Sequence, residues 1–289
     1  MQEALLNREV SSAVLTELKE APCSGNAMRS VCVVSGKGGT GKSMISASLA
    51  FLLSEQGNTL LFDADLGVAN AHILQGMRPT HTIAEVIAGQ TSMRNVVTPC
   101  YDGLDLLAGG SGVAQLASLN GGELEVLGAS FRSVEEEYCY MVVDSAAGLS
   151  RQTIAFAAAS DRVLVVTTPA VTALTDAYAF LKVLLTRRPQ CRPQLIINRV
   201  VVPAEGDRAA ERLTDVTKRF LGVELECIAQ LPDDRAAFVA TQEQRPVVRG
   251  GGNSHLALAL RELGRTIVQD LDTARPCGFG SSLHKHLVD

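Results

Sequence analysis

The chain has 289 residues, 46% of them hydrophobic, and a formal net charge of -5. This length and apolar content suit one large α/β domain with a sizeable core. The acidic balance argues against nucleic acid as the main partner, because nonspecific DNA binding depends on many lysine and arginine contacts to phosphates.

The ends and the cysteines set further expectations. Residues 1–27 are predicted to form a helical appendage, and their four glutamates without an apolar stretch argue against a signal peptide. No apolar run approaches the ~18 residues of a membrane span. The seven cysteines are scattered and never spaced as C-x-x-C, which predicts reduced thiols and gives no support for a zinc or iron-sulfur site. We therefore expect a cytoplasmic protein.

A strand, a glycine-rich turn and a helix are predicted between residues 31 and 55. The turn matches G-x-x-x-x-G-K-[ST], whose backbone N–H groups wrap nucleotide phosphates. Lys42 would bridge the β- and γ-phosphates and the Ser43 hydroxyl would ligate Mg²⁺. A flexible turn with a solvated lysine is disfavoured, because a strand precedes the turn and a helix follows it. The residues predicted to contact the nucleotide here are Gly36, Lys37, Gly38, Gly39, Thr40, Gly41, Lys42, Ser43 and Met44.

Two acidic residues follow the next predicted strand, residues 59–62. Asp63 and Asp65 stand at the carboxyl end of a parallel strand, the edge where open α/β sheets bind ligands. Side chains two residues apart leave a strand on the same side, which lets both carboxylates face the phosphates. A strand-capping aspartate would explain one of them.

Further elements follow in the order of a doubly wound sheet. Short helices are predicted near 71–74 and 82–89, a strand at 104–108, a glycine-rich loop at 109–119 and an amphipathic helix at 123–137. The apolar run 140–143 then ends in Asp144, the form of a Walker B element, whose carboxylate accepts a hydrogen bond from a Mg²⁺-bound water or from Ser43.

The remaining chain alternates strands with helices. Strands are predicted at 162–168, 194–200 and 226–231, and helices at 172–182, 209–221, 237–243 and 254–270. Asn198 ends the second of these strands, which is also an ordinary place for an asparagine. In residues 276–289, Phe279, Leu283 and Leu287 stand one turn apart. A weak amphipathic membrane segment and a disordered tail are both open, and the small positive charge favours the disordered tail.

The ordered motifs resemble the MinD/ParA family of deviant Walker A ATPases. The loop carries the extra Lys37 of that family, and the run from Asp63 to Asn70 is similar to its switch I. Residues 145–150 and Thr175-Asp176-Ala177-Tyr178 resemble the FlhG or FleN branch, which regulates flagellar number. Two departures are Ala170 and Val171, where the family has Glu and Pro; in the wider family that Glu lies at the dimer face. The branch's N-terminal Asp-Gln-Ala-x-x-Leu-Arg motif also has no full match before Met28.

The resemblance implies a three-layer α/β fold, with a mostly parallel sheet flanked by helices and an ATPase domain spanning residues 28–275. It implies catalytic roles for Lys37, which reaches the partner's nucleotide, for Lys42, and for Asp65, which positions the attacking water. Metal roles fall on Ser43, Asp63 and Asp144, and base contacts fall on Asn198, Pro232 and Asp233. The cofactors would be ATP and Mg²⁺.

The implied function is a slow, partner-stimulated ATPase that forms a homodimer on ATP and regulates the position and number of flagella. Its expected partner is a GTPase related to the signal-recognition particle, or another flagellar component, with peripheral contact at the inner face of the membrane left open. The alternative is a division-site or DNA-partitioning ATPase, although the acidic balance disfavours DNA. A bacterial tyrosine kinase would need a terminal tyrosine cluster, and the four tyrosines are internal.

Overall fold

The computed structural model describes residues 28–66, 70–110, 119–250, 252–273 and 275–285. The predicted N-terminal helix lies outside these residues. So do parts of the switch I resemblance (67–69) and most of the glycine-rich loop predicted at 109–119.

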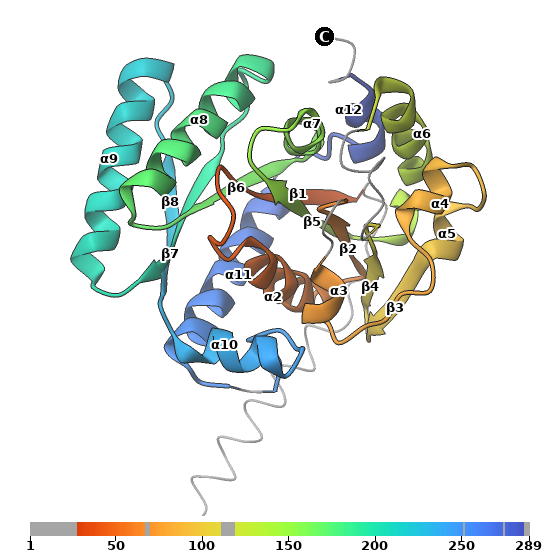
Figure 1. The fold of residues 1–289 in the computed structure, drawn as a ribbon, viewed down its shortest axis with the longest axis horizontal. Coiled ribbons are helices and arrows are strands. Elements are labelled where there is room, and N and C mark those ends of the chain that lie inside the picture. The colour runs from red at the N-terminus through yellow and green to blue at the C-terminus, as the bar shows by residue number, and fades with distance from the viewer. Residues whose placement is uncertain (1–27, 67–69, 111–118, 251, 274, 286–289) are drawn as a thin grey trace, which may run out of the picture.

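An eight-stranded sheet forms the middle layer, in the order β3-β4-β2-β5-β1-β6-β7-β8 (Figure 1). Neighbouring strands are parallel except for β3 and β4, which are antiparallel. The central strands are buried on both faces, so they read as continuous apolar runs. The strands are β1 (Arg29–Ser35), β2 (Thr59–Ala64), β3 (Val97–Tyr101), β4 (Leu104–Leu107), β5 (Tyr140–Ala147), β6 (Arg162–Thr167), β7 (Gln194–Val200) and β8 (Glu226–Pro232).

Helices cover both faces of the sheet, and two apolar cores result. One core joins the sheet to α2, α3, α10 and α11, and the other joins it to α4, α5, α6, α7, α8, α9 and α12. The expected three-layer, doubly wound α/β fold is therefore confirmed. The helices are α2 (Lys42–Ser54), α3 (Ala71–Leu74), α4 (Ile83–Ile87), α5 (Met93–Val96), α6 (Gly121–Arg132), α7 (Arg151–Ala159), α8 (Val171–Arg187), α9 (Pro203–Leu221), α10 (Arg235–Gln242), α11 (His255–Thr273) and α12 (Phe279–Lys285).

Two local predictions differ from the structure. No strand was predicted at β3, which pairs with β4 at the edge of the sheet, where its Pro99 is tolerated. The single helix predicted over 123–137 is in fact α6, begun by a capping box of Asn120 and Glu123, and a separate 3-10 turn at Glu135–Glu137.

The expectation of a disordered tail is wrong for Phe279–Lys285, which form α12. Phe279 and Leu283 are fully buried, and the ring of Phe279 meets that of Phe131 edge to face at 5.0 Å between centroids. A Cβ on Gly128 would lie 2.7 Å from the carbonyl oxygen of Gly280, so two glycines let α6 and α12 approach closely. Phe279 and Leu283 therefore pack into the protein's own core.

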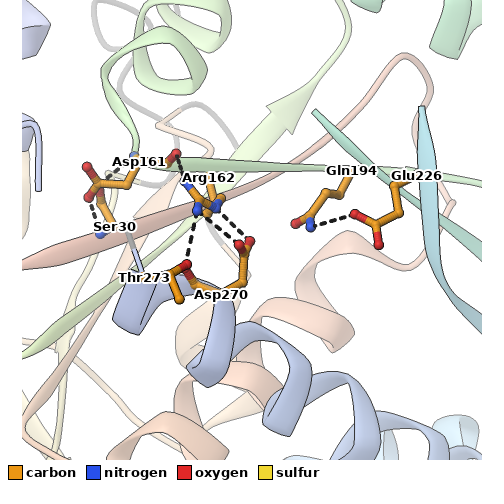
Figure 2. Close-up of polar contacts among 7 residues, drawn as sticks. All are labelled: Ser30, Asp161, Arg162, Gln194, Glu226, Asp270 and Thr273. Atoms are coloured by element: carbon orange, nitrogen blue, oxygen red, sulfur yellow. Dashed lines mark hydrogen bonds and ion pairs between the residues drawn. The ribbon is translucent and has the colours of Figure 1, made fainter. Parts of the chain in front are cut away.

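A polar network holds the amino ends of the strands (Figure 2). The carboxylate of Asp161 accepts hydrogen bonds from the backbone N–H and hydroxyl of Ser30, at 2.7 and 2.8 Å, and from the Cys277 N–H at 2.7 Å. The guanidinium of Arg162 donates to both carboxylate oxygens of Asp270, at 2.6 and 2.9 Å. These contacts join β1 and β6 to α11 and to the segment that leads into α12.

The cysteines are mostly free thiols, as expected. Cys32, Cys100, Cys191, Cys227 and Cys277 are unpaired. Within the described ranges, no helix has the length and apolar character needed to cross a membrane.

Candidate nucleotide site

The phosphate loop, residues 36–41, joins the end of β1 to the start of α2. Gly39 and Gly41 have φ angles of 78° and 93°, the left-handed region that glycine tolerates best. A Cβ on Gly36 would lie 2.0 Å from the Asp176 carbonyl oxygen, so only glycine lets the loop rest against α8. The close approach to α8 and the left-handed glycines together determine the path of the loop backbone.

Asn198, at the end of β7, supports this loop from a neighbouring strand. Its side-chain Nδ2 donates to the Thr40 carbonyl oxygen at 2.7 Å, and a Cβ on Gly41 would lie 2.3 Å from the same nitrogen. The sequence suggested contact with the base for Asn198 and missed this contact with the loop. Since only tertiary structure brings β7 beside the loop, no local signal predicted it.

Two buried carboxylates lie side by side at the carboxyl edge of the sheet. Asp63 and Asp144 are direct partners in the register between β2 and β5, and they are 0% and 1% exposed. Burial raises the pKa of both carboxyl groups, and the charge of Asp144 raises that of Asp63 further. A divalent cation between such groups would remove this penalty.

Two hydroxyl groups of α2 donate hydrogen bonds to Asp144. The Ser46 hydroxyl donates to its Oδ1 at 3.0 Å, and a hydrogen bond from Ser43 lowers the Asp144 pKa against the effect of burial. Ser43 therefore stands beside Asp144 as the sequence predicted. Ser46 was missed, although its place one turn beyond Ser43 on the same helix face was visible in the sequence.

Lys42 is the buried cation of the site. The residue is 8% exposed, and burial lowers the pKa of its ammonium group, whereas the charges of Asp144 and Asp65 oppose that change. A buried lysine next to acidic groups is a compact positive charge that a phosphate would stabilise.

Asp63 also organises the segment that follows β2. Its Oδ1 accepts the Asp65 N–H at 3.3 Å and its Oδ2 accepts the Ala71 N–H at 2.8 Å, so one carboxylate ties the strand end to the start of α3. Asp65 comes directly after β2 and its charge acts on Lys42, Asp63 and Asp144. All three predicted acids are therefore gathered at one edge of the sheet.

Lys37 lies on the exposed side of the loop. Its Nζ donates to the Thr172 hydroxyl, in the first turn of α8, over 3.2 Å. The side chain therefore reaches the start of α8, next to Ala170 and Val171, the two positions that depart from the family pattern.

The site suits a magnesium nucleotide by its own chemistry. Ser43, Asp63 and Asp144 offer the oxygen ligands that Mg²⁺ prefers. Within the described part of the chain, the buried Thr40 hydroxyl oxygen has no hydrogen-bond partner, which leaves it available to a ligand of the loop. Bound Mg²⁺ would neutralise charge on the phosphates.

A cavity of about 450 Å³ opens beside the loop. It is lined by five of the residues expected to contact the nucleotide, Gly41, Met44, Asn198, Pro232 and Asp233. Its lining also includes Arg199, Asp234, Arg235, Ala237, Phe238, Thr241 and Leu256. The phosphate loop and this cavity together match the two ends of a nucleotide.

Comparison with known proteins decides the family. Residues 31–247 match the model of the CobQ/CobB/MinD/ParA nucleotide binding domain. The chain belongs to this family. The MinD/ParA resemblance is thereby confirmed, and with it a nucleotide-binding ATPase fold.

Among relatives, the MinD/ParA-family chain is 33% identical over 238 residues to the antiactivator FleN of Pseudomonas aeruginosa, covering 82% of this chain and 85% of FleN. It is 32% identical over 245 residues to the flagellum site-determining protein YlxH of Helicobacter pylori, covering 84% and 83%. The septum site-determining protein MinD of Thermotoga maritima is 31% identical over 243 residues, covering 82% and 87%.

A solved structure shows the same fold. MinD of Pyrococcus horikoshii, complexed with Mg-ADP, superimposes with a TM-score of 0.69 at 24% identity, covering 83% of this chain and 96% of that one.

Proposed function

We propose that this chain is a Mg²⁺-dependent ATPase that dimerises on ATP and regulates the number or position of flagella. The similarity to FleN and YlxH supports the flagellar role, since both extend over more than four fifths of the chain. The observation that carries the ATPase role is the pair Asp63 and Asp144 beside Lys42 and Ser43 at the end of a glycine-rich loop.

In this proposal each residue acts through its place in the site. Lys42 and the loop N–H groups hold the phosphates, and Ser43, Asp63 and Asp144 hold the metal with its water shell. Asp65 orients the attacking water. Lys37 leaves Thr172 and crosses to the nucleotide of a second copy, so the dimer would form with ATP and separate after hydrolysis.

Light scattering after gel filtration tests the dimer. With MgATP the wild-type chain should shift toward twice its mass, and with MgADP it should stay a monomer. Asp65→Ala should remain dimeric with ATP, because nucleotide binds and is not cleaved. Lys37→Ala should stay folded with little ATPase activity. A mass that ATP leaves unchanged in the Asp65→Ala variant would contradict the dimer model.

Counting flagella and septa in the host tests the cellular role. Loss of the gene should change flagellar number or position with normal division, and wild-type protein but not Lys42→Ala should restore it. Misplaced septa with normal flagella would instead favour the division-site role, to which the similarity with MinD of Thermotoga maritima also points. Proteins that co-purify with Asp65→Ala in ATP, and not in ADP, would identify the expected GTPase or flagellar partner.

A further inference from the structure

An aromatic side chain with no described role stands at the cavity beside the phosphate loop. Phe238, on α10, lines this cavity and is 63% exposed. Single exposed apolar residues are common on protein surfaces and need no explanation of their own. Phe238 differs from such residues because its exposed ring lies in a concave site, where a ligand could contact it.

The helix α10 presents one face to the cavity. Asp234, Phe238 and Thr241 follow one another at spacings of four and three residues and all line the cavity, so they share that face. Ala240, on another face, is buried. Phe238 is thus aimed at the cavity by the same helix rotation that buries Ala240.

The base of α10 is anchored. The Asp234 carboxylate accepts the Ala236 N–H at 2.9 Å and the Leu256 N–H at 3.3 Å, which caps α10 and ties it to the start of α11. The hydrogen bond from Ala236 lowers the pKa of Asp234, so the carboxylate stays charged at neutral pH. Phe238 is one turn from this anchor and therefore has a defined position.

Two strained backbone positions are associated with the cavity and with α10. Among the described residues, Arg199 and Gln244 are the two non-glycine residues with positive φ, at 60° and 51°. Arg199 lines the cavity and pairs with Asp233 across 3.7 Å, and Gln244 follows the end of α10. A left-handed non-glycine residue costs conformational energy and persists only where the surrounding structure holds it. Such residues cluster at ligand sites.

Phe220 offers a contrast. It is equally exposed, at 63%, but lies on α9, and the Arg219 guanidinium lies over its ring at 5.2 Å. In the portion of the chain that the structure describes, neither a ring nor a guanidinium lies over Phe238. One exposed ring already has a stacking partner, and the other has a cavity in front of it.

We propose that Phe238 stacks on the base of the bound nucleotide and sets the preference of the site for a nucleotide over base-free polyphosphate. This inference rests on the proposed nucleotide-binding function and adds to it the residue that recognises the base by its flat face. Stacking on an aromatic side chain contributes to the binding of any base, because every base has such a face.

The chain contains no tryptophan, so Phe238→Trp places a single fluorescent reporter at the site. MgADP is the probe, because it carries the base but lacks the γ-phosphate on which dimerisation is proposed to depend. Magnesium pyrophosphate is the base-free control ligand, and Phe220→Trp is the matched control protein. MgADP should quench the tryptophan introduced at 238 and leave the one at 220 unchanged, and pyrophosphate should quench neither.

Calorimetry with Phe238→Ala and Phe238→Leu completes the test. Because Phe238 is exposed, both variants should keep the wild-type melting temperature. Phe238→Ala should lose about 10- to 100-fold in MgADP affinity, in keeping with the loss of one stacked base, and pyrophosphate affinity should not change. Equal loss for both ligands, or unchanged emission at 238 while calorimetry records MgADP binding, would overturn the stacking role alone. A wild-type chain that binds no MgADP would overturn the proposed function as well.

Discussion

The two edges of the sheet carry similar charged groups, but the pKa of the cation shifts in opposite directions at the two edges. At the amino edge, the hydrogen bond with Asp270 raises the pKa of the Arg162 guanidinium and so stabilises its charge (Figure 2). At the carboxyl edge, burial lowers the pKa of Lys42 and raises that of Asp63 and Asp144. At the amino edge the charged groups pair with one another. The carboxyl edge, in contrast, suits a ligand that brings both a cation and an anion.

This difference indicates that the carboxyl edge lowers the stability of the nucleotide-free chain in return for a binding site. Buried acids beside each other oppose folding in the absence of a cation, and active sites commonly carry such a cost. Substitutions at the two edges should therefore act in opposite directions on the stability of the nucleotide-free chain.

The largest effect is expected for Asp144→Asn. Removing one metal-facing carboxylate should lower MgATP hydrolysis on the order of 100-fold or more, since a bound metal contributes several kcal/mol to charge stabilisation. The same change should raise the unfolding free energy of the nucleotide-free chain by about 1 kcal/mol, because Asp63 loses a like-charged neighbour. A phosphate-release assay and urea denaturation measure the two quantities. Loss of both activity and stability would contradict the comparison.

Asp161→Ala should be the most damaging change at the amino edge. It leaves the N–H groups of Ser30 and Cys277 without their acceptor, and each unsatisfied buried donor costs about 1–3 kcal/mol. We expect the unfolding free energy to fall by about 3 kcal/mol. Asp161→Asn, which keeps an acceptor oxygen, should lose less than half of that in urea denaturation. Equal losses for the two variants would contradict the hydrogen-bonding explanation.

Arg162→Met should have a moderate effect. Both partners of the Arg162 and Asp270 pair are about one quarter exposed, so the cost should be about 1–2 kcal/mol, below that of a fully buried pair. Arg265→Met is the control, because Arg265 and Glu262 are both 70% exposed. Thermal unfolding should separate the two variants, and similar melting temperatures would place the Arg162 pair with ordinary surface pairs.

The smallest effect on stability is expected for Lys37→Ala. Its hydrogen bond to Thr172 is exposed, so the unfolding free energy should change by less than about 0.5 kcal/mol. MgATP hydrolysis should nevertheless be almost lost, which separates a residue that serves the ligand from one that serves the fold. A large fall in the melting temperature would assign Lys37 a structural role instead.

Much of the carboxyl edge was predictable from local sequence. The glycine loop, Lys42 and Ser43 are contiguous, and Asp63 and Asp144 each follow an apolar run that forms a parallel strand. Because parallel strands end at a common edge, knowing the strands was enough to gather these acids in one place. The strand order and the register between β2 and β5 show Asp63 and Asp144 side by side at that edge.

Other features needed contacts between distant segments. Asn198 supports Thr40 across 158 positions, and the Asp161 network joins Ser30 to Cys277. The apolar residues of α12 showed a helical spacing, but spacing does not say whether a membrane, solvent or α6 receives them.

The sequence by itself determined the phosphate loop, most of the strands and helices, and the acidic residues at the strand ends, because each depends on neighbours within one or two turns of chain. Only the tertiary structure decided that the last helix is part of the core, that Asn198 supports the loop, and that Phe238 faces the cavity. Those outcomes depend on how separate elements pack against one another, and no local pattern of residues encodes the surface that a side chain will meet.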